Sequence, residues 1–137
     1  MRVISGYGPQ ENWPEEKRMP LFIALETEIE KAALAGRSVL VEMDANAKLG
    51  NKYIKGDPHE MSPNGLILAK IVERQMLIVG NGLNICKGTI SRKRVTKNSV
   101  EQSVIDIVLF SGDMLDSLVS LDVDEEKKVC TNKSYKS

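Results

Sequence analysis

The chain has 137 residues, and its 19 lysines and arginines balance its 19 aspartates and glutamates. This length suits a single globular domain, and zero net charge argues against a surface that binds nucleic acid or anionic lipid over its whole extent, though not against a local basic face. No run approaches the ~18 apolar residues of a membrane-spanning helix, and no signal-peptide pattern opens the chain, so we expect an intracellular protein, nuclear or cytoplasmic. Two cysteines, Cys86 and Cys130, are too few for a disulfide framework or a zinc site of cysteine pairs, and both are expected to be free thiols.

The first part of the chain predicts a strand, a helix and a second strand. Residues 2–7 have strand character and are followed by a Gly-Pro turn. Apolar residues recur at spacings of three and four over 21–33, which predicts an amphipathic helix with Pro20 in its first turn and Gly36 at its end. The apolar run 38–43 predicts the next strand.

The rest of the chain predicts a long loop and further strands and helices. The loop covers 44–63 and is rich in glycine, asparagine and proline, and loops of this length in compact domains are commonly functional. Ser62 and Pro63 supply the N-cap and first turn of a helix that continues to residue 73. The remaining elements expected are strands at 76–79, 89–92, 103–110 and 119–123 and a short helix at 113–118. This order indicates an α/β layered fold with a mixed sheet.

An acid and an amide follow the second predicted strand. Asp44 and Asn46 stand at its C-terminal end, where α/β sheets place polar sites, and an extended backbone would send both side chains to the same side. A carboxylate can orient or deprotonate a water while an amide donates to a phosphate oxygen, so the pair suits phosphodiester hydrolysis. The alternative is an ordinary turn in which both side chains cap the loop backbone.

Asp106 interrupts the otherwise apolar run 103–110. An unpaired buried charge is costly, so this carboxylate is expected either on a solvated face or held by a partner. Alternation along one strand places Val104, Asp106 and Val108 on the same face.

Residues 87–97, which include the strand predicted at 89–92, form a basic segment. Its cations are Lys87, Arg92, Lys93, Arg94 and Lys97, with no acid among them. Such a segment can follow a phosphate backbone, and it is equally typical of a solvated hairpin tip.

Three other residues have side chains that could take part in a site, but the sequence around them gives a weaker indication. Tyr7, at the end of the first strand, can donate its hydroxyl to a phosphate or serve as a strand-end aromatic. His59 has no partner at metal-ligand spacing and is expected to be exposed rather than catalytic. Trp13, beside Pro14, is expected to anchor a loop rather than to stack on a base.

Four blocks in this order resemble the endonuclease/exonuclease/phosphatase superfamily, which has the DNase-I-like fold, and most closely the endonuclease domains of LINE-type retrotransposons. The blocks are Tyr-Gly-Pro-Gln at 7–10, Asp-Ala-Asn-Ala at 44–47, Gly-Thr-Ile-Ser-Arg at 88–92 and Ser-Val-Ile-Asp-Ile-Val at 103–108. The resemblance implies a partial DNase-I-like α/β sandwich, with a mixed sheet flanked by helices, over residues 1–125. Residues 126–137 would form a polar tail.

The resemblance also implies roles for individual residues. Asp44 would help to activate the attacking water, Asn46 and Tyr7 would bind the scissile phosphate, and Asp106 would orient a catalytic histidine. Family members use Mg²⁺ and cleave DNA. The residues that would face the nucleic acid are Thr89, Arg92, Lys93 and Arg94, with Arg92 foremost.

The sequence departs from the family pattern in several places. Met43 replaces a glycine, and Ile107 replaces an aromatic residue. The family's asparagine and metal-binding glutamate would precede Met1, and its Ser-Asp-His block would follow Ser137. We therefore expect an incomplete domain with impaired hydrolysis and an exposed part of the sheet. The alternative is an inactive remnant that binds nucleic acid or acts as a structural module, dimerising through that exposed sheet.

Overall fold

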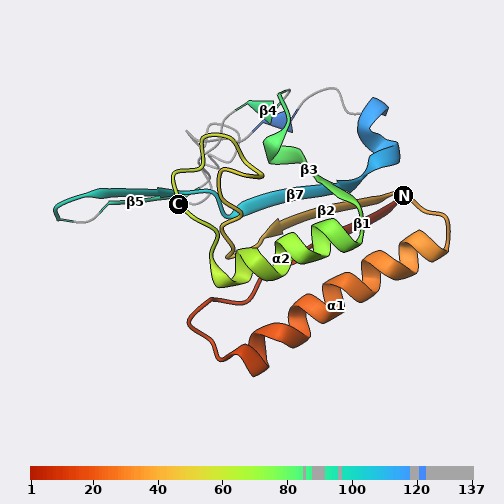
Figure 1. Ribbon diagram of the computed structural model, residues 1–137, viewed down its shortest axis with the longest axis horizontal. Helices are drawn as coiled ribbons and strands as arrows, with labels where there is room; N and C mark the ends of the chain where they lie inside the picture. The colour runs from red at the N-terminus through yellow and green to blue at the C-terminus, as the bar shows by residue number, and fades with distance from the viewer. Residues whose placement is uncertain (85, 88–91, 96, 118–120, 123–137) are drawn as a thin grey trace, which may run out of the picture.

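A mixed four-stranded sheet forms the centre of the fold (Figure 1). The computed structural model describes residues 1–84, 86–87, 92–95, 97–117 and 121–122. In the sheet, β1 (Arg2–Tyr7) runs parallel to β2 (Val39–Asp44), while β7 (Asp106–Ser111) is antiparallel both to β2 and to β3 (Leu77–Val79). The predicted α/β class with a mixed sheet is therefore confirmed.

Two helices, α1 (Glu15–Leu34) and α2 (Pro63–Arg74), pack on the same side of this sheet (Figure 1). Alternate residues of the two central strands point toward them, because successive strand side chains face opposite ways. The resulting core includes Val39, Val41, Ile107 and Leu109 from the strands and Phe22, Ile29, Leu68 and Ile71 from the helices. Full burial of each such side chain stabilises the fold by about 1.5–3 kcal/mol.

Helix α1 begins at Glu15, five residues before the position that the sequence predicted. Glu15 and Glu16 occupy the first turn, where negative charge interacts favourably with the helix dipole. Pro20 therefore lies inside the helix, which costs the hydrogen bond that its missing N–H would have donated to the preceding turn. The predicted end is confirmed, with Gly36 at a φ of 68° just beyond Leu34.

The strand predicted at 103–110 is confirmed from Asp106 onward, but its first residues do not belong to the same strand. The segment divides into β6 (Val100–Ser103) and β7, and β6 pairs with β5 (Arg92–Val95) in a hairpin that projects from the body of the protein (Figure 1). Val104 and Ile105, between the two strands, are both buried. The alternation expected from Val104 through Val108 fails because the backbone turns away here, and the carbonyl of Ile105 accepts a hydrogen bond from the Ala45 N–H at 2.7 Å.

Short elements complete the described chain. The loop and the capped start of α2 agree with the prediction, since the Ser62 hydroxyl accepts from the Gly65 N–H at 3.1 Å. The remaining elements are the 3-10 helices η1 (Gly80–Gly82) and η2 (Gly112–Ser117) and the paired short strands β4 (Cys86–Lys87) and β8 (Leu121–Asp122). Cys86 is half-buried in β4. Cys130, residues 89–91 and the predicted tail lie outside the described residues.

Strand β1 is strongly exposed. Five of its six residues are open to solvent, Val3 among them, and only Ile4 is partly covered. An exposed sheet surface was expected, and within the described strands it lies at β1, the edge of the sheet. Among the residues that the structure describes, no helix has the length and apolar content needed to cross a membrane.

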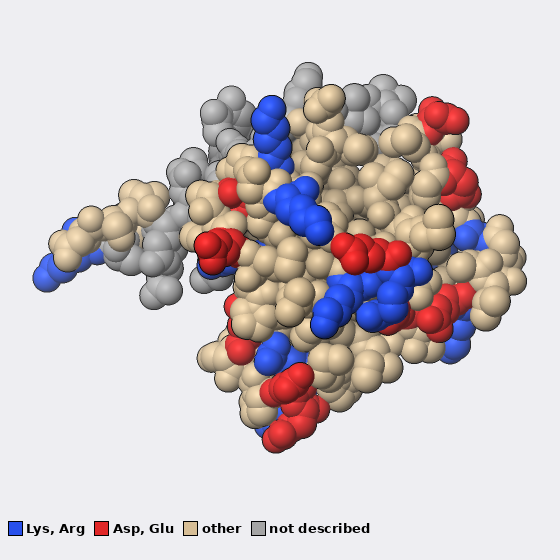
Figure 2. Space-filling model, viewed as in Figure 1, with Lys and Arg blue, Asp and Glu red and all other residues tan. Residues whose placement is uncertain are grey.

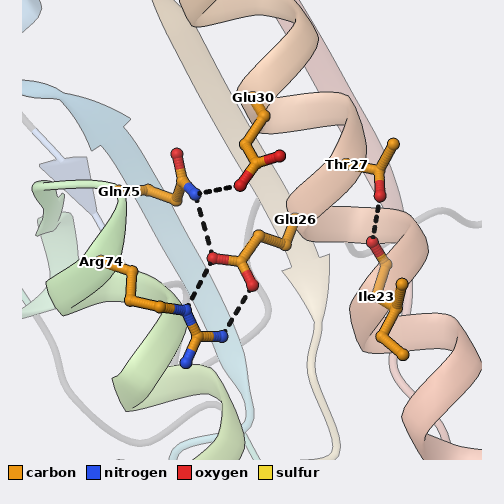
Figure 3. A network of polar contacts seen from close by, with 6 residues as sticks. All are labelled: Ile23, Glu26, Thr27, Glu30, Arg74 and Gln75. Carbon is orange, nitrogen blue, oxygen red and sulfur yellow. Dashed lines mark hydrogen bonds and ion pairs between the residues drawn. The ribbon is translucent and has the colours of Figure 1, made fainter.

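A polar network joins the two helices (Figure 3). The Arg74 guanidinium donates to both carboxylate oxygens of Glu26, from Nε at 3.0 Å and from Nη2 at 2.6 Å. Gln75 donates to Glu26 at 3.0 Å and to Glu30 at 3.1 Å. The Arg74 hydrogen bonds outweigh partial burial and hold the pKa of Glu26 below its ordinary value. Acidic and basic side chains are mixed over this helical face of the molecule (Figure 2).

Candidate functional site

Three of the predicted site residues form one row across the sheet. Tyr7 of β1 is the registered partner of Asp44 of β2, and Asp44 is the registered partner of Asp106 of β7. Partners in adjacent strands point to the same face of a sheet. Tyr7 and Asp44 end their strands and Asp106 begins its own, so residues far apart in the sequence meet at one end of the sheet.

The two carboxylates of this row stand opposite each other. Cα atoms of antiparallel partners lie about 4.5–5.5 Å apart, and like charges placed in this way destabilise a sheet. Asp44 is half-buried and Asp106 is exposed. The cost of this repulsion falls when a cation lies between the carboxylates, so the pair fits two oxygen ligands of a hard divalent ion.

Asn46 lies close to the row, but its backbone conformation differs from the one predicted. Its φ of 44° is left-handed, so the extended backbone expected from Asp44 to Asn46 is wrong, and asparagine is one of the few residues that tolerate this conformation. The Asn46 Nδ2 donates to the Gly8 carbonyl at 2.8 Å, and the Asn46 N–H donates to Asp44 Oδ1 at 3.3 Å. The turn interpretation is therefore correct in part, since these contacts tie the loop to the end of β1. An amide carries two N–H donors, so the bond to Gly8 uses one of the two that Asn46 has.

A surface depression of about 600 Å³ is lined by Tyr7, Asp44 and Asn46, whereas Asp106 is not part of its lining. A second hollow of about 340 Å³ shares Gln10, Asn46 and Ile105 with it, so the two are neighbours. The larger depression is lined by Tyr7, Gly8, Gln10, Trp13, Asp44, Asn46 and Ile105, and the smaller one adds Glu11, Asn12 and Lys48. Asp44, Asn46 and Tyr7 thus share one open cavity that can admit an extended polar ligand.

Gly8 sets how closely the first two strands approach at the site. Its N–H donates to the Asp44 carbonyl at 2.6 Å. A Cβ atom at Gly8 would lie 2.1 Å from the Ala45 carbonyl oxygen, a distance that backbone atoms cannot accommodate without moving. The sequence indicated only a turn at this glycine, whereas the structure shows that the absence of a side chain is needed.

Asn64 is a buried residue of the site that the sequence did not reveal. Its Nδ2 donates to the carbonyls of Pro9 at 2.7 Å and Asn46 at 3.0 Å, and its Oδ1 accepts from Arg18 at 2.8 Å. Its backbone N–H donates to the Glu11 carboxylate at 3.0 Å. The side chain is fully buried and joins the loops after β1 and β2 to α1 and α2. An asparagine in the first turn of a helix is common, so its spacing gave no signal.

Asn81 holds the backbone around Asp106 and was also missed. Its Nδ2 donates to the Asp106 carbonyl and its Oδ1 accepts from the Val108 N–H, both at 2.9 Å. These two bonds imitate those of a neighbouring strand beyond the end of β3. The Gly-Asn-Gly sequence around Asn81 indicated only a turn.

The other predicted residues lie elsewhere. Arg92, Lys93 and Arg94 belong to β5, and their contact with nucleic acid stays a prediction. Thr89 lies outside the described residues. His59 is half-buried rather than exposed, because its loop folds back and its N–H donates to Asp57 Oδ1 at 3.0 Å. No group of three or more His, Cys, Asp or Glu side chains suited to a metal ion occurs among the described residues.

The sheet topology, the helical layer and the polar row at the strand ends define a partial DNase-I-like α/β fold. One solved structure with this fold is the endonuclease domain of TRAS1, a telomere-specific non-LTR retrotransposon. It aligns with a TM-score of 0.55 and 20% sequence identity over 80% of this chain. The chain spans less than half of that structure, 44% of its length. No protein-family model matches the sequence, and the search of curated proteins gives no match.

Proposed function

We propose that the chain is part of a Mg²⁺-dependent endonuclease that hydrolyses phosphodiester bonds in DNA. The observation that carries this proposal is that Asp44 lines one depression together with Tyr7 and Asn46, and is the registered partner of Asp106 on the neighbouring strand. The fold shared with a retrotransposon endonuclease domain supports the same class of reaction. The proposal includes an intracellular site of action, nuclear or cytoplasmic, because the proposed substrate is DNA.

Each side chain of the row has a proposed role. Asp44 orients and deprotonates the attacking water, while Asn46 and Tyr7 donate hydrogen bonds to the oxygens of the scissile phosphate. Asp106 has the position of the carboxylate that, by the family resemblance, orients a histidine base. Asp44 and Asp106 are also the residues that would hold Mg²⁺, which when bound neutralises charge on the phosphate.

Hydrolysis by these 137 residues alone is proposed to be impaired. His59, the one histidine in the sequence, does not line the depression. The family's metal-binding glutamate also has no counterpart in the matched blocks. A positioned base and a metal ion each contribute large factors to the rate, so a site without this histidine and glutamate should react slowly.

The second candidate is a module that binds nucleic acid without cleaving it. The basic β5 and the exposed Lys97 in the turn that follows it favour this function, because a phosphate backbone can be held without any catalytic group. The exposed β1 edge would then be available for pairing with a second copy.

A plasmid-nicking assay with Mg²⁺ tests the first function. We expect slow conversion of supercoiled plasmid to the open circle, reduced about 10²–10⁴-fold or to the blank rate in Asp44→Ala. Asp116→Ala, which removes an exposed carboxylate of η2, is the matched control and should retain the activity. Fluorescence anisotropy with labelled DNA is measured in parallel. Binding without nicking above the blank would support the second candidate, and nicking that persists in Asp44→Ala would contradict the assigned role.

A further inference from the structure

The depression at the strand ends contains an unusual concentration of exposed aromatic surface. Five aromatic residues are described in the structure. Phe22 and Phe110 are buried, and Tyr53 is half-buried and donates its hydroxyl to Glu73 at 2.7 Å. The remaining two, Tyr7 at 84% exposure and Trp13 at 43%, both line the same depression.

The position of Trp13 is fixed through its backbone. Its N–H donates to the Gln10 carbonyl at 3.1 Å, and its carbonyl accepts from Arg18 Nε at 2.9 Å. Arg18 also donates to the buried Asn64, which bonds to Asn46. These polar bonds hold the loop backbone, and the Trp13 side chain is left partly exposed. That the ring also anchors the loop, as the sequence suggested, stays a prediction.

A partly exposed tryptophan forgoes the hydrophobic stabilisation of burial, so its place in a polar depression is informative. Indole presents a flat apolar face, and a nucleobase stacks on such a face whatever its sequence. The neighbouring polar groups, the Tyr7 hydroxyl and the Asn46 amide, suit a phosphate. One nucleotide can therefore place its phosphate on the polar groups and its base on the ring.

We propose that Trp13 is a base-stacking residue that receives an unpaired nucleobase beside the phosphate bound at Tyr7 and Asn46. The inference rests on the proposed function, in that it takes the depression as the binding site of a phosphodiester. A base paired within a duplex is stacked on its neighbours and does not offer its face to a side chain. The ligand class is accordingly single-stranded or locally unpaired DNA, recognised at this point without sequence preference.

Trp13 is the single tryptophan of the chain, so its fluorescence reports on this site alone. The full chain is titrated with a short single-stranded oligonucleotide in Mg²⁺. A matched oligomer with the same sugar–phosphate backbone but abasic units in place of all nucleotides is the control ligand. We expect saturable quenching of the Trp13 emission by the first ligand and none by the second.

Substitutions and a second measurement complete the test. By anisotropy, Trp13→Ala should bind the base-bearing oligonucleotide about 5- to 150-fold more weakly, while Trp13→Phe should keep most of the affinity. Leu34→Ala, at the far end of α1 and 90% exposed, should bind like the unaltered chain. If Trp13→Ala does not fold, as judged by circular dichroism, the fluorescence titration of the unaltered chain decides.

The possible failures are distinguishable. Binding by anisotropy with unchanged Trp13 emission, or with equal quenching by the abasic oligomer, would overturn base stacking and leave the proposed function standing. Absence of binding to either oligomer would overturn the inference together with the nucleic-acid binding on which it rests.

Discussion

Asp44 and Asp106 are registered partners on the antiparallel strands β2 and β7, so two carboxylates leave the same face of the sheet side by side. Like charges in this position cost up to about 1 kcal/mol relative to neutral residues. Under the proposed function, a divalent cation held by these carboxylates would offset the repulsion. Stability and ligand binding should therefore respond in opposite directions when one of these charges is removed.

The variant Asp44→Asn tests this relationship. In EDTA, the free energy of unfolding of the variant should exceed that of the unaltered chain by up to about 1 kcal/mol. The substitution removes the repulsion, while Oδ1 can still accept the Asn46 N–H. Added Mg²⁺ should raise the melting temperature of the unaltered chain and leave that of Asp44→Asn unchanged. Thermal unfolding by circular dichroism, with Asp116→Asn as the control, measures both effects. Equal responses of the two proteins to Mg²⁺ would exclude Asp44 as a ligand.

Asn64 should be a stability determinant of the site loops. Replacement by alanine removes the amide hydrogen bonds to Pro9, Asn46 and Arg18, leaving buried carbonyl groups unsatisfied. The expected loss is about 2–4 kcal/mol of unfolding free energy, measured by urea denaturation. Asn51→Ala, at an exposed position of the neighbouring loop, should change it by less than about 0.5 kcal/mol. A similar small effect at Asn64 would show that its hydrogen bonds are replaceable by water.

Gly8 and Gly6 provide a matched pair of substitutions in the same segment. Gly8→Ala places a methyl group 2.1 Å from the Ala45 carbonyl oxygen, so the ends of β1 and β2 must separate. A methyl group at Gly6 meets no atom within 4 Å, and its alanine variant should match or slightly exceed the stability of the unaltered chain. We expect a clear drop in melting temperature for Gly8→Ala alone. Equal melting temperatures for the two variants would contradict the close approach described for Gly8.

The ion pair between α1 and α2 should make stability depend on acid pH. Hydrogen bonds from Arg74 lower the pKa of Glu26 in the folded chain, so the unfolded chain takes up the proton first as pH falls. The stabilisation is complete above the unfolded pKa, about 4.3, and is lost as pH drops through the lower folded value. Unfolding experiments from neutral to acid pH should show Glu26→Gln less stable at neutral pH, with the difference shrinking below about pH 4. Glu60→Gln, on an exposed loop, should show no such convergence.

Local chemistry in the sequence was enough to place most of the central elements. Interactions between near neighbours fix short pieces of backbone in three places. These are the cap at Ser62 and Pro63, the glycine after α1 and the apolar run at 38–43. The start of α1 was misplaced because a proline inside a helix costs only one hydrogen bond, which the rest of a long helix can offset. The division of 103–110 was missed because β6 pairs locally with β5 in a hairpin, whereas β7 pairs with β2, which is distant in sequence.

The candidate site likewise depends partly on local chemistry and partly on long-range packing. The sequence by itself determined which residues have the necessary chemistry, namely Tyr7, Asp44, Asn46 and Asp106, because charge and hydrogen-bonding capacity are properties of single side chains. Only the tertiary structure decided that Asp44 faces Asp106, that Asn64 holds the loops, and that Trp13 stands open in the depression. These relations depend on strand register and on the packing of distant segments, such as Asp44 and Asp106, which are 62 residues apart, and no local pattern encodes them.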